Sequence, residues 1–204
     1  MDLKVLAEIL DLLSEVFLDP EANLVLRSRE LMGELEGEDD ILDLLRRMTE
    51  SAGSQSERSE EYVRLFMHGV ESEPVHPYES ALLYGKLMHR ECLDSVNALY
   101  SSAGIRPNGY LKIPPDHLGL ELEFIAFLIR RINESTPGGK DAQHWNELAC
   151  KLLKDHLQKI VPVFLERLSS LNPHVYYQRA SDLLVVGIVK ASEITDGLRQ
   201  EKIS

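Results

Sequence analysis

The sequence contains few cysteines, and their scarcity excludes the protein classes that depend on them. Only Cys92 and Cys150 occur among the 204 residues. A disulfide framework and a zinc site built from cysteine both need more thiols than two widely separated residues supply. Each cysteine lies within an amphipathic helical pattern. We therefore expect two buried thiols in a reducing compartment.

Long hydrophobic runs are also missing. The longest aliphatic run, LLVVGIV at 183–189, is far shorter than the roughly 20 residues that a helix needs to span a bilayer. The N-terminal segment MDLKVLAEILDLLSEVF is acidic and amphipathic, whereas a signal peptide has a basic start and an uninterrupted apolar stretch. These features predict a cytoplasmic protein without stable membrane insertion.

Basic residues are scarce in the first part of the chain. The net charge is −12, and residues 1–60 hold sixteen of the 34 acidic residues but only six of the 22 basic ones. Such a field repels nucleic acid and anionic lipid and favours basic partners. We expect no nucleic-acid partner, although a solvated helix face also explains a charge run of this kind.

Signatures of catalysis and of cofactor binding are absent from the sequence. The segment PGGKD at 137–141 has two glycines and a lysine, but it lacks the P-loop frame and a preceding strand. No candidate nucleophile lies in a recognisable turn. We therefore predict neither an enzyme nor a cofactor site.

Apolar residues at helical spacing dominate the chain from its first segment onward. This pattern predicts an all-α fold, a single-domain helical bundle of about eight or nine helices over residues 1–204. Residues 67–77, rich in glycine and proline, form a hinge-like loop between two helical halves. Because such hinges permit exchange of halves between chains, a monomer and a domain-swapped dimer both stay open.

Several helices of the second half can be placed by their patterns. A long helix is expected over 79–101, and another over 141–158, interrupted or restarted by Pro162. The last helix should begin after Pro173, although the valines of 183–189 also fit a buried strand. The stripe that the helix over 79–101 would bury consists of Ala81, Tyr84, Met88, Cys92, Val96 and Leu99.

The segment PPDHLGLELEF at 114–124 begins the most apolar helix of the chain, expected over 116–133 with Asp116 as its N-cap. His117 and Glu121 are four residues apart and share one helix face. With Asp116 they would form a polar pocket for a ligand, or else an N-cap beside a histidine satisfied by a carboxylate. We predict no metal site, because this pair supplies two ligands and a stable site needs three or four.

Three motifs in this chain resemble those of one family. PPDHLGLELEF resembles the E-P-x-D-H segment of the TorD/DmsD group of redox-enzyme maturation chaperones, to which the NarJ-type chaperones are related. YVRLF at 62–66 is similar to the family's aromatic-x-x-Leu-Phe element. PVHPYES at 74–80 is similar to its Pro-aromatic-x-Ser segment. Order and spacing agree, and the motifs cover the middle third of the chain.

This resemblance implies a chaperone that binds the twin-arginine leader of a molybdenum-cofactor oxidoreductase precursor until the cofactor is loaded. The family's leader-binding positions correspond to Pro114, Asp116 and His117 here, and the family's leading Glu is replaced by Ile113. Glu121 would add a second carboxylate for the arginines. The second-rank candidates from the other two motifs are Leu65, Pro77, Tyr78 and Ser80.

Two alternatives accompany this interpretation. A NarJ-like assembly factor would grip the catalytic subunit itself and need no leader. A small helical hydrolase would use His117 and Glu121, with or without a metal ion. Nucleotide or pterin-cofactor binding is suspected for the family, but no motif in this sequence indicates it.

Overall fold

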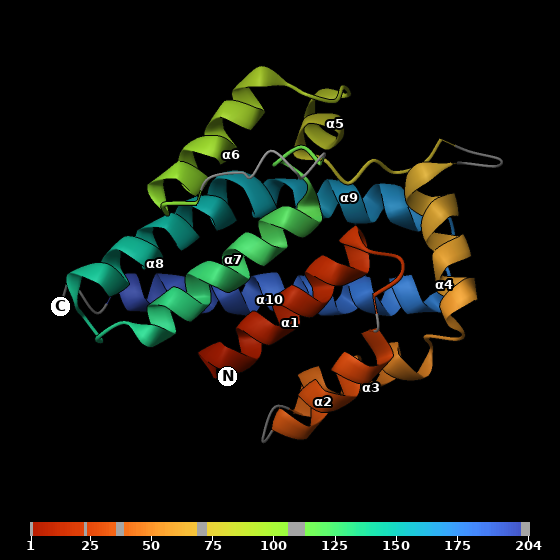
Figure 1. Cartoon of the computed structure of the whole chain (residues 1–204), viewed down its shortest axis with the longest axis horizontal. Helices are drawn as coiled ribbons and strands as arrows, with labels where there is room; N and C mark the ends of the chain where they lie inside the picture. The colour runs from red at the N-terminus through yellow and green to blue at the C-terminus, as the bar shows by residue number, and fades with distance from the viewer. Residues whose placement is uncertain (1, 23, 36–38, 69–72, 106–112, 201–204) are drawn as a thin grey trace.

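A computed structural model of the chain describes residues 2–22, 24–35, 39–68, 73–105 and 113–200. Within these residues there is no β-strand, and the all-α prediction is confirmed (Figure 1). The α-helices are α1 (Leu3–Leu18), α2 (Leu24–Glu34), α3 (Asp39–Glu50), α4 (Gln55–Tyr62), α5 (Glu79–Tyr84), α6 (Arg90–Ser102), α7 (Leu118–Glu134), α8 (Lys140–Leu152), α9 (Gln158–Ser170) and α10 (Val175–Gln200).

Two π-helical turns connect some of these segments without a break. The turn η1 (Val63–Met67) continues α4, and the turn η2 (Leu153–Leu157) joins α8 to α9. Counted as continuous helices, the described residues therefore form nine, in agreement with the predicted eight or nine. Ser54 begins α4 with a capping box, because its hydroxyl accepts from the Glu57 N–H while the Glu57 carboxylate accepts from the Ser54 N–H.

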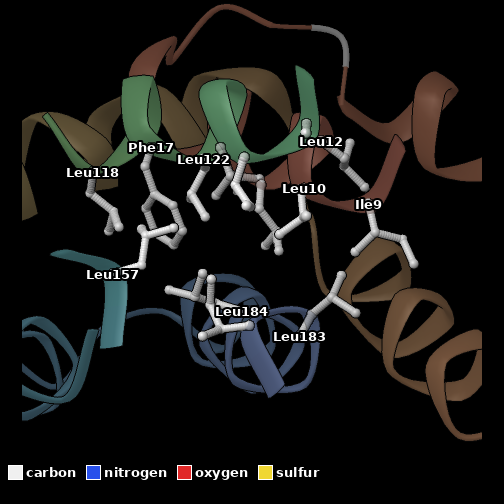
Figure 2. Close-up of a cluster of buried hydrophobic side chains, with 14 of the residues drawn as sticks. Ile9, Leu10, Leu12, Phe17, Leu118, Leu122, Leu157, Leu183 and Leu184 are labelled. Atoms are coloured by element: carbon white, nitrogen blue, oxygen red, sulfur yellow. The ribbon is translucent and has the colours of Figure 1, made fainter. Parts of the chain in front are cut away.

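The core forms where α1 and α7 lie side by side above α10. Figure 2 shows leucines and Phe17 from these helices meeting the side chain of Leu157 from η2. Gly119 permits the closest approach, because a Cβ at this position would lie 2.4 Å from Cγ of Leu18. In Figure 1, α2 and α3 flank this core on one side and α5 and α6 on the other.

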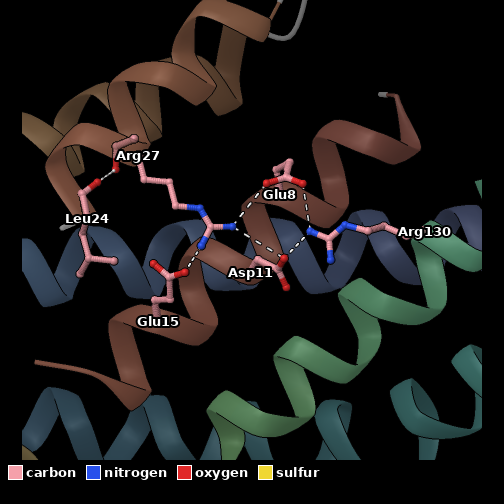
Figure 3. Close-up of polar contacts among 7 residues, drawn as sticks. Glu8, Asp11, Glu15, Leu24, Arg27 and Arg130 are labelled. Carbon is pink, nitrogen blue, oxygen red and sulfur yellow. Dashed lines mark hydrogen bonds and ion pairs between the residues drawn. The ribbon is translucent and has the colours of Figure 1, made fainter. Parts of the chain in front are cut away.

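An ion-pair cluster fixes two further helices to α1. In Figure 3, Arg27 from α2 and Arg130 from α7 reach the carboxylates of Glu8, Asp11 and Glu15. Nη2 of Arg130 lies 3.0 Å from Oε1 of Glu8, and Nη2 of Arg27 lies 3.3 Å from Oε2 of the same residue. Burial alone would raise the pKa of Glu8, but the two arginines outweigh burial and lower it. Three acids of the N-terminal segment are thus occupied by the chain's own arginines.

The predicted helix over 79–101 is wrong, because the chain breaks it into α5 and α6. Gly85 adopts a left-handed φ of 67° and ends α5. Met88 also has a positive φ, of 61°. Tyr84 and Met88 leave the predicted buried stripe and are 49% and 60% exposed, whereas its other four residues are buried.

Two other expectations are resolved by the structure. Pro162 lies inside α9 and does not interrupt the helix. The irregularity is the turn η2 just before it, where the Gln158 N–H donates to the carbonyl of Leu153, five residues back. The 183–189 segment is helical, within α10. Both cysteines are buried and unpaired, as expected.

Among the described helices, none combines the length and the apolar character needed to cross a membrane. Of the hinge-like loop predicted over 67–77, residues 69–72 lie outside the described part of the chain. Residues 73–77 are non-helical, and the Val75 N–H donates to the Leu65 carbonyl at 2.8 Å, which ties this stretch back to η1.

Candidate functional site

Two of the sequence motifs meet where the start of α5 touches the start of α7. Tyr78 and His117 form an isolated antiparallel β-bridge, and their rings pack edge to face with centroids 4.7 Å apart. The Leu118 N–H donates to the Pro77 carbonyl at 2.7 Å, and the Glu79 N–H donates to the Asp116 carbonyl at 2.8 Å. We call residues 77–80 and 116–118 the motif junction. Backbone pairing therefore joins PVHPYES to PPDHLGLELEF.

Asp116 serves this junction and does not cap α7, so the predicted N-cap is wrong. Its carboxylate oxygen Oδ2 accepts from the Ser80 N–H at 2.9 Å and from the Ser80 hydroxyl, and the Cys92 thiol lies 3.6 Å from it. The N-cap is His117, whose Nδ1 accepts from the Gly119 N–H at 3.0 Å. A buried carboxylate with several donors to one oxygen holds the two motifs in place.

His117 is a neutral, buried histidine. Burial lowers its pKa to about 4, although the charge of Asp116 opposes this shift. Because Nδ1 accepts a hydrogen bond, the neutral ring carries its proton on Nε2. The alternative of an N-cap beside a satisfied histidine is therefore close to the structure, but the residues differ: His117 is the N-cap, and Ser80 donates to one carboxylate oxygen of Asp116.

Glu121 does not join His117, and its carboxyl lies instead among residues from other elements. It is fully buried, and neither of its oxygens meets a donor among the described residues. Burial, followed by the charges of Glu79 and Asp116, raises its pKa well above the ordinary value and so favours the protonated form of Glu121. In this form it can donate a hydrogen bond to Glu79.

Glu79 and His156 complete this group, and sequence reasoning missed both. Nδ1 of His156 lies 2.6 Å from Oε2 of Glu79, and its Nε2 lies 3.1 Å from the hydroxyl of Ser95 on α6. We call Glu79, Glu121 and His156 the buried triad. The available signals were the acid next to Ser80 in PVHPYES, and a histidine on the apolar line of the helix predicted over 141–158.

Cys92 borders both groups and is a passive thiol. Burial raises its pKa, and the charges of Glu79 and Asp116 raise it further. A thiol in such surroundings stays protonated and unreactive at neutral pH.

Most of the predicted site residues are buried. Leu65, Pro77, Ser80, Asp116, His117 and Glu121 are inaccessible, and only Tyr78 and Pro114 are half-buried. Leu65 belongs to the hydrophobic core. In this conformation a client can touch the motif junction only at Tyr78, and Pro114 is accessible just outside it. The buried residues fix the shape of the surface above them.

The fold defines an all-helical protein, and comparisons with known proteins supply its class and its family. A family model described as nitrate reductase delta subunit matches residues 30–166, about two thirds of the chain. The chain belongs to this family, that of the NarJ/TorD-type maturation chaperones. Membership confirms the predicted family and the expectation of a chaperone in place of an enzyme, and it removes the hydrolase alternative.

Several relatives carry the name chaperone protein TorD. The protein of Vibrio parahaemolyticus serotype O3:K6 is 24% identical over 151 residues, which cover 72% of this chain and 68% of the relative. That of Vibrio cholerae serotype O1, strain ATCC 39541, is 24% identical over 167 residues, covering 79% and 72%. That of Vibrio vulnificus YJ016 is 28% identical over 149 residues, covering 71% and 67%. No solved structure matches the chain significantly.

Proposed function

We propose that this protein is a cytoplasmic chaperone that binds the twin-arginine leader of a molybdenum-cofactor oxidoreductase precursor and holds the precursor until its cofactor is loaded. The observation that carries the proposal is the motif junction, because the two segments that resemble the family's leader-binding elements are bonded to each other there. Family membership supports a chaperone function. The choice of a leader as the ligand rests on the motifs.

The surface next to the junction suits the apolar part of a leader. α5 begins at the junction and spans about 9 Å, at 1.5 Å per residue. The helix ends at Tyr84, and we call residues 84–89, which lead from there to α6, the α5–α6 corner. Tyr84, Leu87 and Met88 are exposed at this corner. Adjacent exposed apolar side chains of this size are typical of an interaction surface.

Apolar burial alone would not hold a leader. Burying about 300 Å² of apolar surface gains roughly 7.5 kcal/mol, and association itself costs several kcal/mol. A micromolar complex needs about 8 kcal/mol net. Charge must therefore contribute, and the permanent charges of two arginines suit carboxylates.

The acids available for those arginines are not the ones on α1, because Arg27 and Arg130 already occupy them. Glu91, exposed in the first turn of α6, lies two residues after the corner. Between them, Nε of Arg90 lies 3.5 Å from Oδ2 of Asp94 in the same helix. We assign Glu91 as a carboxylate for the leader, while the remaining N-terminal acids add attraction at long range.

Calorimetric titration with a leader peptide from a candidate client tests this proposal. We expect micromolar binding, weakened at least about tenfold when both arginines are replaced by glutamine. Leu87→Ser should also weaken binding, whereas Leu26→Ser, which alters an equally exposed leucine on α2, should not. The absence of binding by any leader, or equal binding of the glutamine peptide, would contradict the proposal.

A NarJ-like assembly factor that grips the catalytic subunit is the second candidate. The observation that favours it is the burial of Asp116 and His117, since no leader side chain reaches them in this conformation. Titration with a client fragment that lacks its leader separates the two functions. Undiminished binding of that fragment would favour the assembly factor. Whether the chaperone acts as a monomer or as a domain-swapped dimer is a separate question, answered by its mass in light scattering.

A further inference from the structure

We propose that the buried triad of Glu79, Glu121 and His156 is a binding site for a divalent first-row transition metal ion such as Zn²⁺. One ligand atom from each of the three residues lies within 4.8 Å of the other two. The residues come from α5, α7 and η2, so a bound ion would connect three elements. This inference is independent of leader binding.

The first argument is the environment of Glu121. Its side chain is completely buried, and both carboxyl oxygens lack a donor among the described residues. Even when protonated Glu121 donates to Glu79, no described donor reaches its other oxygen, and a buried group left in this state suggests a missing water molecule or ion. The carboxyl faces Glu79, a second acid. A cation between the two carboxylates would satisfy both.

The second argument is the orientation of His156. Its Nε2 lies 3.1 Å from the Ser95 hydroxyl, and its Nδ1 points at Glu79. When Nε2–H donates to the serine, Nδ1 can offer its lone pair to an ion, which would displace the proton of the 2.6 Å hydrogen bond between Nδ1 and Oε2 of Glu79. Histidines that bind metals are commonly fixed in this way, with the second ring nitrogen donating to a neighbouring oxygen.

The donor set indicates which ions fit. Two carboxylate oxygens and one imidazole nitrogen suit zinc, manganese or iron, whereas calcium and magnesium prefer oxygen alone. Zinc bonds of about 2.1 Å in a tetrahedral arrangement place ligand atoms about 3.4 Å apart. Nδ1 of His156 and Oε2 of Glu79, now 2.6 Å apart, would separate slightly to admit the ion.

Three protein ligands leave at least one coordination position for another ligand. Binding should therefore be weaker than at a closed four-ligand structural site. Ser95 is exposed at the surface of α6, and it stands between His156 and solvent.

Equilibrium dialysis of the metal-free full-length chain against micromolar Zn²⁺, with metal measured by mass spectrometry, tests the site. We expect about one zinc ion per chain, together with a higher melting temperature, because an ion that binds only the folded state stabilises it. Glu121→Gln and His156→Gln should each weaken binding at least about tenfold. The matched controls are Glu123→Gln, an exposed acid on the same helix, and His144→Gln, an exposed histidine on α8. Both should bind like the wild type.

Two results would overturn the proposal. One is a wild-type chain that takes up no stoichiometric zinc, manganese or iron(II). The other is a Glu121→Gln chain that binds zinc as well as the wild type does. Glu121→Gln preserves the shape of the side chain and removes a buried acid, so it decides the question even if His156→Gln fails to fold. Circular dichroism of each variant verifies that it is folded.

Discussion

Asp116 accepts hydrogen bonds from both the backbone N–H and the hydroxyl of Ser80, although 36 residues separate them. This double contact joins the loop before α5 to the start of α7. Because both groups are buried, neither finds water as a substitute when the other is removed. The stability of the motif junction should therefore depend on this pair.

Ser80→Ala should lower the free energy of unfolding by about 1–2 kcal/mol, because it removes one of the donors to a buried carboxylate. Urea denaturation measures the change. Ser102→Ala is the control, since Ser102 is exposed and its hydroxyl bonds only within α6. It should change stability by less than about 0.5 kcal/mol. Equal effects of the two substitutions would contradict the role given to Ser80.

His117 should stay neutral until strongly acidic pH. Its pKa in the folded state, about 4, lies below the ordinary histidine value of 6.5 because the ring is buried. The lowered pKa means that the neutral form favours folding, so stability is complete above pH 6.5 and falls as the pH drops from 6.5 towards 4. An NMR titration of the His117 ring protons checks the value, with the exposed His144 as a reference signal. Titration of His117 near pH 6.5 would show that it is not buried as described.

Glu121→Gln should stabilise the metal-free protein at pH 8. Burial raises the pKa of Glu121 above the ordinary glutamate value of 4.5, so its favourable contribution to stability is complete below pH 4.5 and is lost as the pH rises through the folded-state pKa. Glutamine does not titrate, and the advantage of the variant should therefore grow from pH 4.5 to pH 8. Urea denaturation in the presence of a chelator measures it at both values. A constant difference would mean that Glu121 is ionised in the folded protein.

Gly119→Ala should destabilise the fold by about 1–3 kcal/mol, because the added methyl group would collide with Leu18 and approach the Ser14 carbonyl. Gly197→Ala is the matched control. A Cβ at residue 197 of α10 meets nothing within 4 Å, and alanine should stabilise that helix by about 0.5–1 kcal/mol. Thermal unfolding of both variants reveals the opposite signs. If Gly119→Ala did not destabilise the protein, α1 and α7 would lie farther apart than described here.

Arg130→Ala should lower the free energy of unfolding by about 1 kcal/mol at low salt and by less at high salt, since its carboxylate partners are only partly buried. Arg179→Ala is the comparison, because Arg179 has a single exposed partner in Asp182. It should have little effect. If the loss in the free energy of unfolding were the same at low and high salt, the packing of the aliphatic part of Arg130 would be its cause.

Helical spacing was sufficient to predict most of the helices, because apolar residues that recur at this spacing must bury one face. The same reasoning failed between Tyr84 and Arg90. In the sequence, apolar residues keep their helical spacing on both sides of Gly85. The helix ends because the backbone of this glycine is left-handed. A single glycine can be tolerated within a helix, so its presence alone does not predict a break.

The candidate site was predictable only where its residues are close in sequence. Asp116, His117 and Glu121 lie within one turn or two, and their motif identified them. Ser80 was identified by its own motif, but Glu79 and His156 were not. These two residues are 77 positions apart, and a tertiary contact at that range leaves no periodic trace. Helical spacing placed His117 and Glu121 on one face, yet they serve different neighbours because His117 precedes the helix and acts as its cap.

The π turn η2 also fixes the rotation of α9 relative to α8 about the helix axis. A π turn can be described as an α-helix with one residue inserted, and each residue of an α-helix turns the chain by about 100°. Removal of one residue from 153–157 would restore the regular spacing and rotate α9 by that angle relative to α8. The imidazole of His156 would then leave the carboxylates, and Phe164 would leave the core. The length of this helix, counted to the single residue, sets the direction in which its second half faces.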